Sequence, residues 1–234
     1  MSDGHTGAAV CRATALDEQA WIAEALAAPV PGRALRVWIY TKPAVVLGCS
    51  TGPDAAVAAR SAAAGIEWCV RPSGGGAVLA GRWLLGASVI FPAQDPLIAA
   101  SIPESFRWLG VAHAAWLRGL GIAVRAVASP AQSARDDLRW SCFGNSSRWE
   151  VEAQGRKIVG LAQARRRNGV LFSAGMLVEP PPWRLLCDVL GRPREDAIAL
   201  SARTASCAEL LGASVAAEDL AQSLAQALLQ ELVQ

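Results

Sequence analysis

The stretch Arg71-Pro72-Ser73-Gly74-Gly75-Gly76-Ala77-Val78 places three adjacent glycines between two apolar runs. Glycines in such a position leave backbone N–H groups uncovered and let the main chain approach a ligand closely. A later stretch, Gly155-Arg156-Lys157-Ile158-Val159-Gly160-Leu161-Ala162-Gln163, holds one lysine inside an apolar, strand-like run. A lysine in that setting suits an activated acyl group or a phosphate. The two motifs in this order predict a binding site for such a group.

The composition indicates a folded protein. The chain has 234 residues, enough for one large domain or two small ones, and we expect one domain over residues 1–234 without an accessory C-terminal domain. With 53% hydrophobic and 18% charged residues, it can fill a sizeable core. The net charge of +2 is too small to indicate binding to nucleic acid or to an anionic membrane.

The N-terminus and the cysteines predict a cytoplasmic protein with reduced thiols. No basic region followed by an apolar segment stands at the N-terminus, as a secretory signal would require. The six cysteines are scattered singly without a Cys-x-x-Cys pair, so we expect no metal site.

Hydrophobic periodicity predicts an α+β fold with a mixed, largely antiparallel sheet flanked by helices. The pattern is not a strict βαβ alternation and lacks Gly-x-Gly-x-x-Gly, which disfavours a Rossmann fold. Residues 128–139 read as a polar loop. We expect helices over residues 17–28, 53–64, 103–120, 183–190 and 217–233, and strands over 35–40, 43–49, 66–71, 83–91, 122–127, 148–152, 157–162 and 169–178.

The glycine loop has two interpretations. It is either a tight turn that needs positive φ or a cradle whose amides face a carboxylate or phosphate. In the second interpretation, Arg71 holds an anionic oxygen and Ser73 donates a hydrogen bond.

Lys157 and Cys142 are the candidate catalytic residues. Lys157 is either an exposed residue after a hairpin glycine or a buried ammonium that polarises an acyl carbonyl. Cys142, in Trp140-Ser141-Cys142-Phe143, is either a core residue or a nucleophile that meets Lys157 in one pocket and accepts an acyl group.

The remaining polar residues carry weaker signals. Arg165-Arg166-Arg167 is either a solvated hairpin end or a contact for an acidic protein. His113 is typical of a helix surface or a satisfied core position, and Asp136-Asp137 of a solvated loop.

In order along the chain, these motifs resemble the lipoate–protein ligase A and octanoyltransferase family, which shares its catalytic domain with biotin–protein ligases. Val46-Leu47-Gly48 is similar to an early strand of that family, residues 71–78 to its glycine-rich acyl-binding motif, and residues 155–163 to its lysine motif. Cys142 is similar to the nucleophile of the ligase-like octanoyltransferases. The resemblance implies a biotin/lipoate ligase catalytic-domain-like fold.

The resemblance also implies site roles and partners. Lys157 and Cys142 would be catalytic, and the substrate or nucleotide would be bound by Arg71, Ser73, Gly74, Gly75, Gly76, Ala77, Gly160 and Ala162. The implied reaction attaches a lipoyl or octanoyl group to a lysine of a lipoyl-type acceptor domain. A ligase would use lipoate or octanoate with ATP and Mg and form an acyl-adenylate. A transferase would take the group from acyl carrier protein through a cysteine thioester.

Three departures from the family pattern stand out. Val70 replaces the first of two arginines, Ala80-Gly81 replaces a histidine that is often followed by aspartate, and Ala174 replaces a histidine before Gly175. From the three glycines we expect the ligase slightly over the transferase. A separate partner could supply the accessory ligase domain. A non-catalytic acyl- or partner-binding relative is the third hypothesis.

Overall fold

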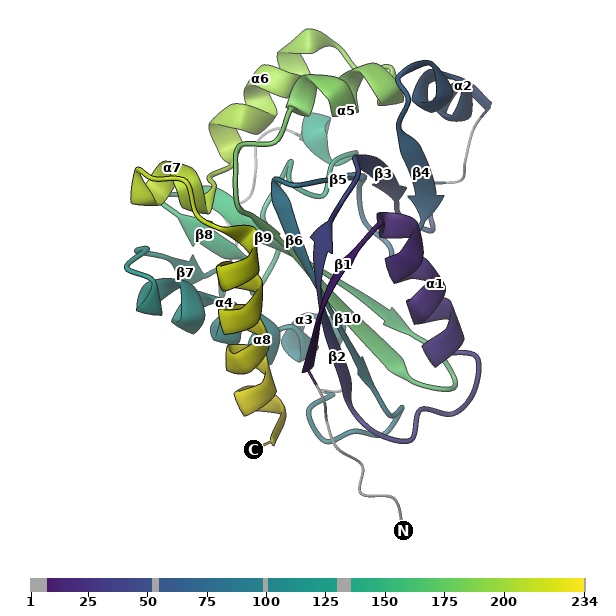
Figure 1. Cartoon of the computed structure of the whole chain (residues 1–234), viewed down its shortest axis with the longest axis vertical. Helices are drawn as coiled ribbons and strands as arrows, with labels where there is room; N and C mark the ends of the chain where they lie inside the picture. Colours follow the sequence, from purple (N-terminus) through teal and green to yellow (C-terminus); the bar gives the residue numbers. More distant parts are fainter. Residues whose placement is uncertain (1–7, 52–54, 99–100, 130–135, 234) are drawn as a thin grey trace.

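The computed structural model describes residues 8–51, 55–98, 101–129 and 136–233 (Figure 1). At its centre is a seven-stranded sheet in the order β1-β2-β6-β10-β9-β8-β7. Only β1 and β2 pair in parallel among these strands, and the other pairs are antiparallel. The strands are β1 (Ala8–Ala13), β2 (Ala34–Tyr40), β6 (Leu84–Phe91), β10 (Val170–Leu177), β9 (Arg156–Arg165), β8 (Val151–Ala153) and β7 (Arg125–Ala126).

A second, three-stranded sheet carries the glycine loop. It consists of β3 (Ala44–Leu47) between β4 (Glu67–Val70), which is parallel to it, and β5 (Val78–Ala80), which is antiparallel. The glycine loop connects β4 to β5. The loop therefore starts and ends on the two strands that flank β3, which holds it against the end of that strand.

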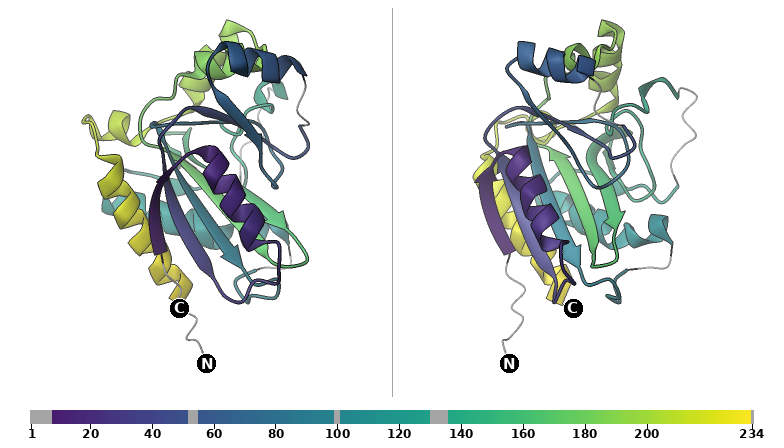
Figure 2. Two further views of the ribbon diagram at one scale, coloured as in Figure 1. Left: turned by 45° about the vertical axis from the view of Figure 1, so that its right-hand side comes forward. Right: turned by 90° about the vertical axis from the view of Figure 1, so that its right-hand side faces the viewer.

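Helices cover both faces of the large sheet (Figure 2). Helix α1 (Ala15–Ala25) lies on one face, where Glu18 accepts a hydrogen bond from Ser88 of β6. Helices α4 (Arg107–Gly119) and α8 (Ala217–Val233) lie on the other. In α8 the buried leucines recur every fourth residue, so they form one apolar stripe. They are Leu220, Leu224, Leu228 and Leu232.

Sequence signals explain how α1 begins. The Thr14 hydroxyl accepts from the Asp17 amide at 3.2 Å, and the Asp17 carboxylate accepts from the Thr14 amide at 2.8 Å. This reciprocal capping box satisfies two of the amides that a helix leaves free at its start. The other helices are α2 (Ala55–Ala63), α3 (Ile102–Ser105), α5 (Trp183–Leu190), α6 (Arg194–Arg203), α7 (Cys207–Leu211) and the 3₁₀ turn η1 (Asp136–Leu138).

The structure confirms the predicted α+β class and its largely antiparallel sheet. Most predicted elements are present within a few residues of their expected bounds, and α5 and α8 match them at both ends. The predicted hairpin turn is also present, with positive φ at Gln154 and Gly155. No described helix is both long and apolar enough to cross a lipid bilayer.

Three predicted segments differ from the structure. Only Arg125–Ala126 pairs as a strand within residues 122–127, because its partner β8 is itself only three residues long. The predicted helix over 103–120 is divided at Phe106 into α3 and α4. The predicted loop 128–139 includes residues 130–135, which lie outside the described residues, and ends in η1.

Four elements were not predicted. Strand β5 is buried but only three residues long, and the other three elements have weak apolar patterns. Strand β1 lies at the edge of the sheet and has no fully buried residue. Helix α6 buries only Ala197 and Leu200, while its Ile198 is 71% exposed. The last is the short helix α7, which buries Cys207. Edge and surface elements carry little of the periodicity on which prediction depends.

Close contact between α4 and the segment before β8 generates the first prediction. A Cβ on Gly110 would lie 1.9 Å from the Trp149 carbonyl oxygen, whereas a Cβ on Gly119 of the same helix would meet nothing within 4 Å. We expect Gly110→Ala to lower the free energy of unfolding by about 1–3 kcal/mol, because backbone must move apart. Gly119→Ala should leave it unchanged or raise it. Denaturant melts of both variants measure this, and equal midpoints would contradict the proposed contact.

Candidate active site

The glycine loop is held by backbone contacts with the end of β3. The Cys49 amide donates to the Ser73 carbonyl at 3.0 Å, and the Arg71 amide donates to the Leu47 carbonyl at 2.9 Å. A Cβ on Gly48 would lie 2.1 Å from the Gly75 carbonyl oxygen, and Gly75 itself has φ of 95°. Both interpretations of the loop therefore start from the same fact: it is a tight turn that requires glycine at Gly75.

Arg71 supports this loop. Its Nη2 donates to the carbonyls of Gly74 at 2.9 Å and Gly76 at 3.0 Å, and the residue is only 9% exposed. Its Nε is buried without a hydrogen-bond partner among the described residues, as is the Ser73 hydroxyl. Contact of Arg71 with an anionic ligand remains a prediction, since part of its guanidinium already binds the loop.

The segment that carries Cys142 pairs directly with the end of the glycine loop. The Ala77 amide donates to the Trp140 carbonyl at 2.7 Å, and the Cys142 amide donates to the Ala77 carbonyl at 2.9 Å. A Cβ on Gly76 would lie 2.5 Å from the Ser141 carbonyl carbon and 2.7 Å from the Cys142 nitrogen. Gly76 thus lets the two segments approach, and this approach fixes where the Cys142 backbone lies.

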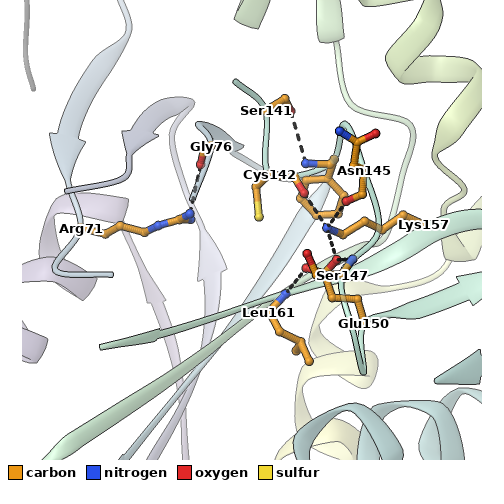
Figure 3. Close-up of polar contacts among 10 residues, drawn as sticks. Arg71, Gly76, Ser141, Cys142, Asn145, Ser147, Glu150, Lys157 and Leu161 are labelled. Carbon is orange, nitrogen blue, oxygen red and sulfur yellow. Dashed lines mark hydrogen bonds and ion pairs between the residues drawn. The ribbon is translucent and has the colours of Figure 1, made fainter. Parts of the chain in front are cut away.

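Lys157 is buried, so the exposed-turn interpretation is wrong. The residue is 2% exposed, and Figure 3 shows its side chain reaching the loop that follows Cys142. Its Nζ donates to the carbonyls of Cys142 at 2.5 Å and Asn145 at 3.1 Å. It also pairs with Glu150 Oε2 at 2.6 Å and lies 5.4 Å from the centre of the Phe143 ring. These contacts occupy all three donors of the ammonium.

Glu150 is a part of the site that sequence reasoning missed. It is 2% exposed; besides Lys157, it accepts the Ser147 amide at 2.6 Å and the Leu161 amide at 2.9 Å (Figure 3). It therefore joins the loop after Cys142 to strand β9. The available signal was a carboxylate at the start of a strand, Glu150 before Val151, shortly ahead of a lysine in the next strand.

Gly160 is the point where Cys142 and Lys157 come together. A Cβ on Gly160 would lie 3.3 Å from Cys142 Sγ, 3.3 Å from Lys157 Cε and 3.5 Å from Lys157 Nζ. The bare backbone at Gly160 leaves room for a small group between the thiol and the ammonium. The two side chains approach each other here, but they do not line one pocket as predicted. Cys142 is only partly buried, and its role as nucleophile stays a prediction.

A pocket extends from this point between the two sheets. Of the predicted binding residues, Arg71, Gly160 and Ala162 line it, as does Cys142. Ser73, Gly74, Gly75, Gly76 and Ala77 are not among its lining residues, and neither is Lys157, which faces a separate polar hollow beside Asn145 and Arg203. The apolar walls are formed by Val46, Val78, Ala80, Leu84, Leu161 and Leu171.

Ala80 and Ala174, the positions where the resemblance led us to expect histidines, both line this pocket. Ala80 is 1% exposed and Ala174 is 6% exposed. Methyl groups stand there in place of imidazoles, so these positions contribute neither a charge nor a hydrogen bond to a bound molecule.

A buried carboxyl group also lines the pocket. Glu18 of α1 is 6% exposed; it accepts hydrogen bonds from the Tyr40 hydroxyl and the Ser88 hydroxyl, both at 2.7 Å. Burial raises the pKa of Glu18 above its ordinary value, which favours the neutral acid. Sequence reasoning missed this residue, although Glu18 lies one turn before Ile22 on the apolar face of the predicted helix.

The other singled-out residues lie away from this pocket. Arg166 donates to the Pro72 carbonyl at 2.8 Å, next to the glycine loop. His113 is fully buried in α4, where Nδ1 lies 2.8 Å from the Leu109 carbonyl and burial lowers its pKa to about 4. Asp137 lies 3.8 Å from Arg203. Among the described residues, no cluster of His, Cys, Asp and Glu side chains could hold a metal ion.

Comparison with known proteins assigns the family. The model of the lipoyl protein ligase A/B catalytic domain matches residues 12–229. The chain belongs to this family. It is therefore an enzyme of the lipoate ligase and octanoyltransferase class, as the resemblance implied.

Sequence relatives and structural neighbours of this family differ in their named activity. The chain is 31% identical to the octanoyltransferase LipM of Kyrpidia tusciae, over 87% of this chain and 76% of that protein. Shorter alignments to LipM proteins of other bacteria cover about half of each relative.

The solved structures share the fold at low identity. Lipoate-protein ligase A bound with ATP superposes with a TM-score of 0.70 at 21% identity, over 98% of this chain and 86% of the other. The bi-partite lipoate protein ligase of Thermoplasma acidophilum, studied with its E2 lipoyl domain, gives 0.69 at 20% identity, over 97% and 84%. These likenesses confirm the predicted ligase-like fold.

Two glycines of one loop provide a matched test of the contact that positions Cys142. Gly76→Ala should lower stability by about 1–3 kcal/mol and reduce activity, because the added methyl group displaces the Ser141–Cys142 backbone. At Gly74 an added Cβ meets nothing within 4 Å, so Gly74→Ala should retain both stability and activity. Thermal melts and acyl-transfer rates of the two variants measure the difference. Equal behaviour would show that the loop does not position Cys142.

The buried ion pair gives a second prediction. Glu150→Leu should lower the free energy of unfolding by about 3 kcal/mol, since it leaves the Lys157 ammonium buried without its counter-ion. Glu152, two residues along, pairs at 3.4 Å with Arg125, whose side chain is 74% exposed. Glu152→Gln should therefore cost less than about 1 kcal/mol. Chemical denaturation measures both, and similar losses would show that the buried pair is not the stronger support.

Proposed function

We propose that this protein is an octanoyltransferase that carries its acyl group as a thioester on Cys142. The observation that carries the proposal is that Cys142 Sγ and the Lys157 side chain approach each other at Gly160. Cys142 and Gly160 also line a mainly apolar pocket. The similarity to LipM octanoyltransferases supports this route over the adenylating ligase that the three glycines slightly favoured. The acyl donor would be acyl carrier protein and the acceptor a lysine of a lipoyl-type domain.

The proposed reaction has two balanced steps. The Cys142 thiol gives up its proton, and its sulfur attacks the carbonyl carbon of the carrier-bound octanoyl thioester. The carbon–sulfur bond to the carrier breaks, and the proton passes to the departing sulfur to give the carrier thiol. The ε-amine of the acceptor lysine then attacks the Cys142 thioester. An amide forms, the sulfur of Cys142 leaves, and the amine proton returns it to the thiol. Neither step consumes ATP.

Lys157 would stabilise the negative charge that develops on the thioester oxygen in each step. In the structure its three donors bind Glu150 and the carbonyls of Cys142 and Asn145. One of these contacts must be exchanged for the oxyanion, and the Asn145 carbonyl, at 3.1 Å, is the longest of the three. The ammonium is thus held next to the reaction centre before substrate arrives.

The adenylating ligase is the second candidate. It is favoured by the glycine loop, whose backbone could approach a phosphate. It is also favoured by the Nε of Arg71 beside the loop, which has no hydrogen-bond partner within the described part of the chain. In that mechanism lipoate or octanoate would react with Mg-ATP, and Cys142 would form no acyl adduct.

Intact-protein mass spectrometry after incubation with octanoyl-loaded acyl carrier protein tests the proposal. We expect a hydroxylamine-sensitive octanoyl adduct that is lost in Cys142→Ser and retained in Cys49→Ser, an exposed cysteine used as the control. A parallel reaction with lipoate, Mg-ATP and an acceptor domain tests the ligase. Modification of the acceptor only with ATP, without a protein adduct, would overturn the thioester route.

Lys157→Ala should slow formation of the adduct about 100-fold, in line with the loss of one oxyanion donor. Because this change leaves Glu150 buried without its cation, the variant also loses stability, and its melting temperature must be measured alongside the rate. A folded Lys157→Ala variant with the full rate would remove Lys157 from the mechanism.

A further inference from the structure

Three glycines form a continuous row across the large sheet, under the pocket. In register, Gly86 of β6 faces Gly175 of β10, and Gly175 faces Gly160 of β9. Register partners in antiparallel strands present their side-chain positions to the same face. From Gly160 to Gly86 the row crosses two interstrand spacings, about 10 Å, which is comparable to the extended length of an octanoyl chain. Gly160 and Gly175 line the pocket, whereas the Tyr40 hydroxyl lies over Gly86 and ends this path.

The two ends of this row have different chemistry. At Gly160 an added Cβ would lie 3.3 Å from Cys142 Sγ, and at Gly86 it would lie 2.1 Å from the Tyr40 hydroxyl oxygen. Between them, at Gly175, the first contact would be the Leu84 side chain at 3.4 Å. An acyl group bound to Cys142 and lying along the row would therefore direct its distal end toward Tyr40.

The distal end of the row is polar. Tyr40 donates to Glu18, which also accepts from Ser88. Ser88 is the register partner of Ser173, and Ser173, Tyr40 and Glu18 all line the pocket. Each Glu18 oxygen accepts one of these two bonds, and the neutral acid that burial favours also has one O–H to donate.

Two further pocket residues have buried polar atoms without partners. The Oε1 atom of Gln19 and the Nε atom of Arg71 make no hydrogen bond among the described residues, and both residues line the same pocket. One is an acceptor and the other a donor. An unsubstituted hydrocarbon end would satisfy neither, and leaving buried polar groups unpaired costs free energy.

We propose that the acyl chain accepted by this pocket carries a neutral hydrogen-bonding group, of the hydroxyl type, at or near its distal end, and that Glu18 and Tyr40 select for it. The inference rests on the proposed acyl transfer through Cys142 and changes the preferred chain from octanoyl to one that carries a hydroxyl group. A hydroxyl can donate and accept at once, which matches the mixture of acceptors and donors at this end of the pocket. A site built to bind a hydroxyl discriminates strongly against the analogue that lacks it.

Competition between two acyl donors tests this proposal. Carrier protein loaded with ω-hydroxyoctanoyl or octanoyl groups is offered to the wild-type enzyme, and kcat/KM for loading of Cys142 is compared by mass spectrometry. We expect a preference for the hydroxylated chain of at least about tenfold. Glu18→Leu should abolish or reverse that preference mainly by raising octanoyl use, while Glu24→Gln, an exposed position on the same helix, should retain it.

Two additional measurements keep the outcome decisive. If Glu18→Leu does not fold, Glu18→Gln and Tyr40→Phe are used, and each should reduce the preference at unchanged secondary structure. Efficient loading of octanoyl with no gain from the hydroxyl would overturn the inference and leave the transferase intact. If neither donor loads Cys142, the proposed function fails. The binding of octanoate and of ω-hydroxyoctanoate is then compared by calorimetry. Tighter binding of octanoate would overturn the inference about the pocket.

Discussion

The requirement that a buried ammonium be surrounded by acceptors organises the centre of this protein. Lys157 lies on the central sheet, and Glu150, with the carbonyls of Cys142 and Asn145, lies on the preceding loop. An unpaired charge in the protein interior costs much free energy. The folded state therefore requires the contacts that join this loop to the sheet. The same contacts bring the Cys142 thiol to Gly160, so one ion pair both supports the fold and assembles the candidate reaction centre.

Glycines, which have no side chain, allow the remaining close contacts of this site. Gly76 lets the glycine loop pair with the Cys142 segment, Gly48 lets the same loop cross the end of β3, and Gly160 leaves space between the thiol and the ammonium. At each point another residue would place a Cβ within 3.3 Å of a neighbouring atom. The site is thus formed largely by backbone at close approach, which explains why the motifs are rich in glycine although few glycines contact the pocket itself.

The pocket combines mainly apolar walls with a polar end. Ala80 and Ala174 remove two imidazoles from the walls, while Glu18, Tyr40 and Ser88 place a hydrogen-bonded carboxyl group at the far end of the glycine row. Alanines therefore stand where the family resemblance led us to expect histidines, and polar groups stand at the end toward which we propose that the acyl chain points. This redistribution is a physical reason to expect a change in the accepted chain without a change in the reaction at Cys142.

The sequence by itself determined the α+β class, the two motifs and the pair Lys157 and Cys142, because periodicity and glycine spacing are local properties of the chain. It failed for β1 and α6, whose apolar faces are too small to produce a periodic signal. Only the tertiary structure decided that Arg71 braces the glycine loop, that Glu150 holds Lys157, and that Gly86, Gly160 and Gly175 align. Those facts depend on strand register and on contacts between distant segments, which no single stretch of sequence encodes.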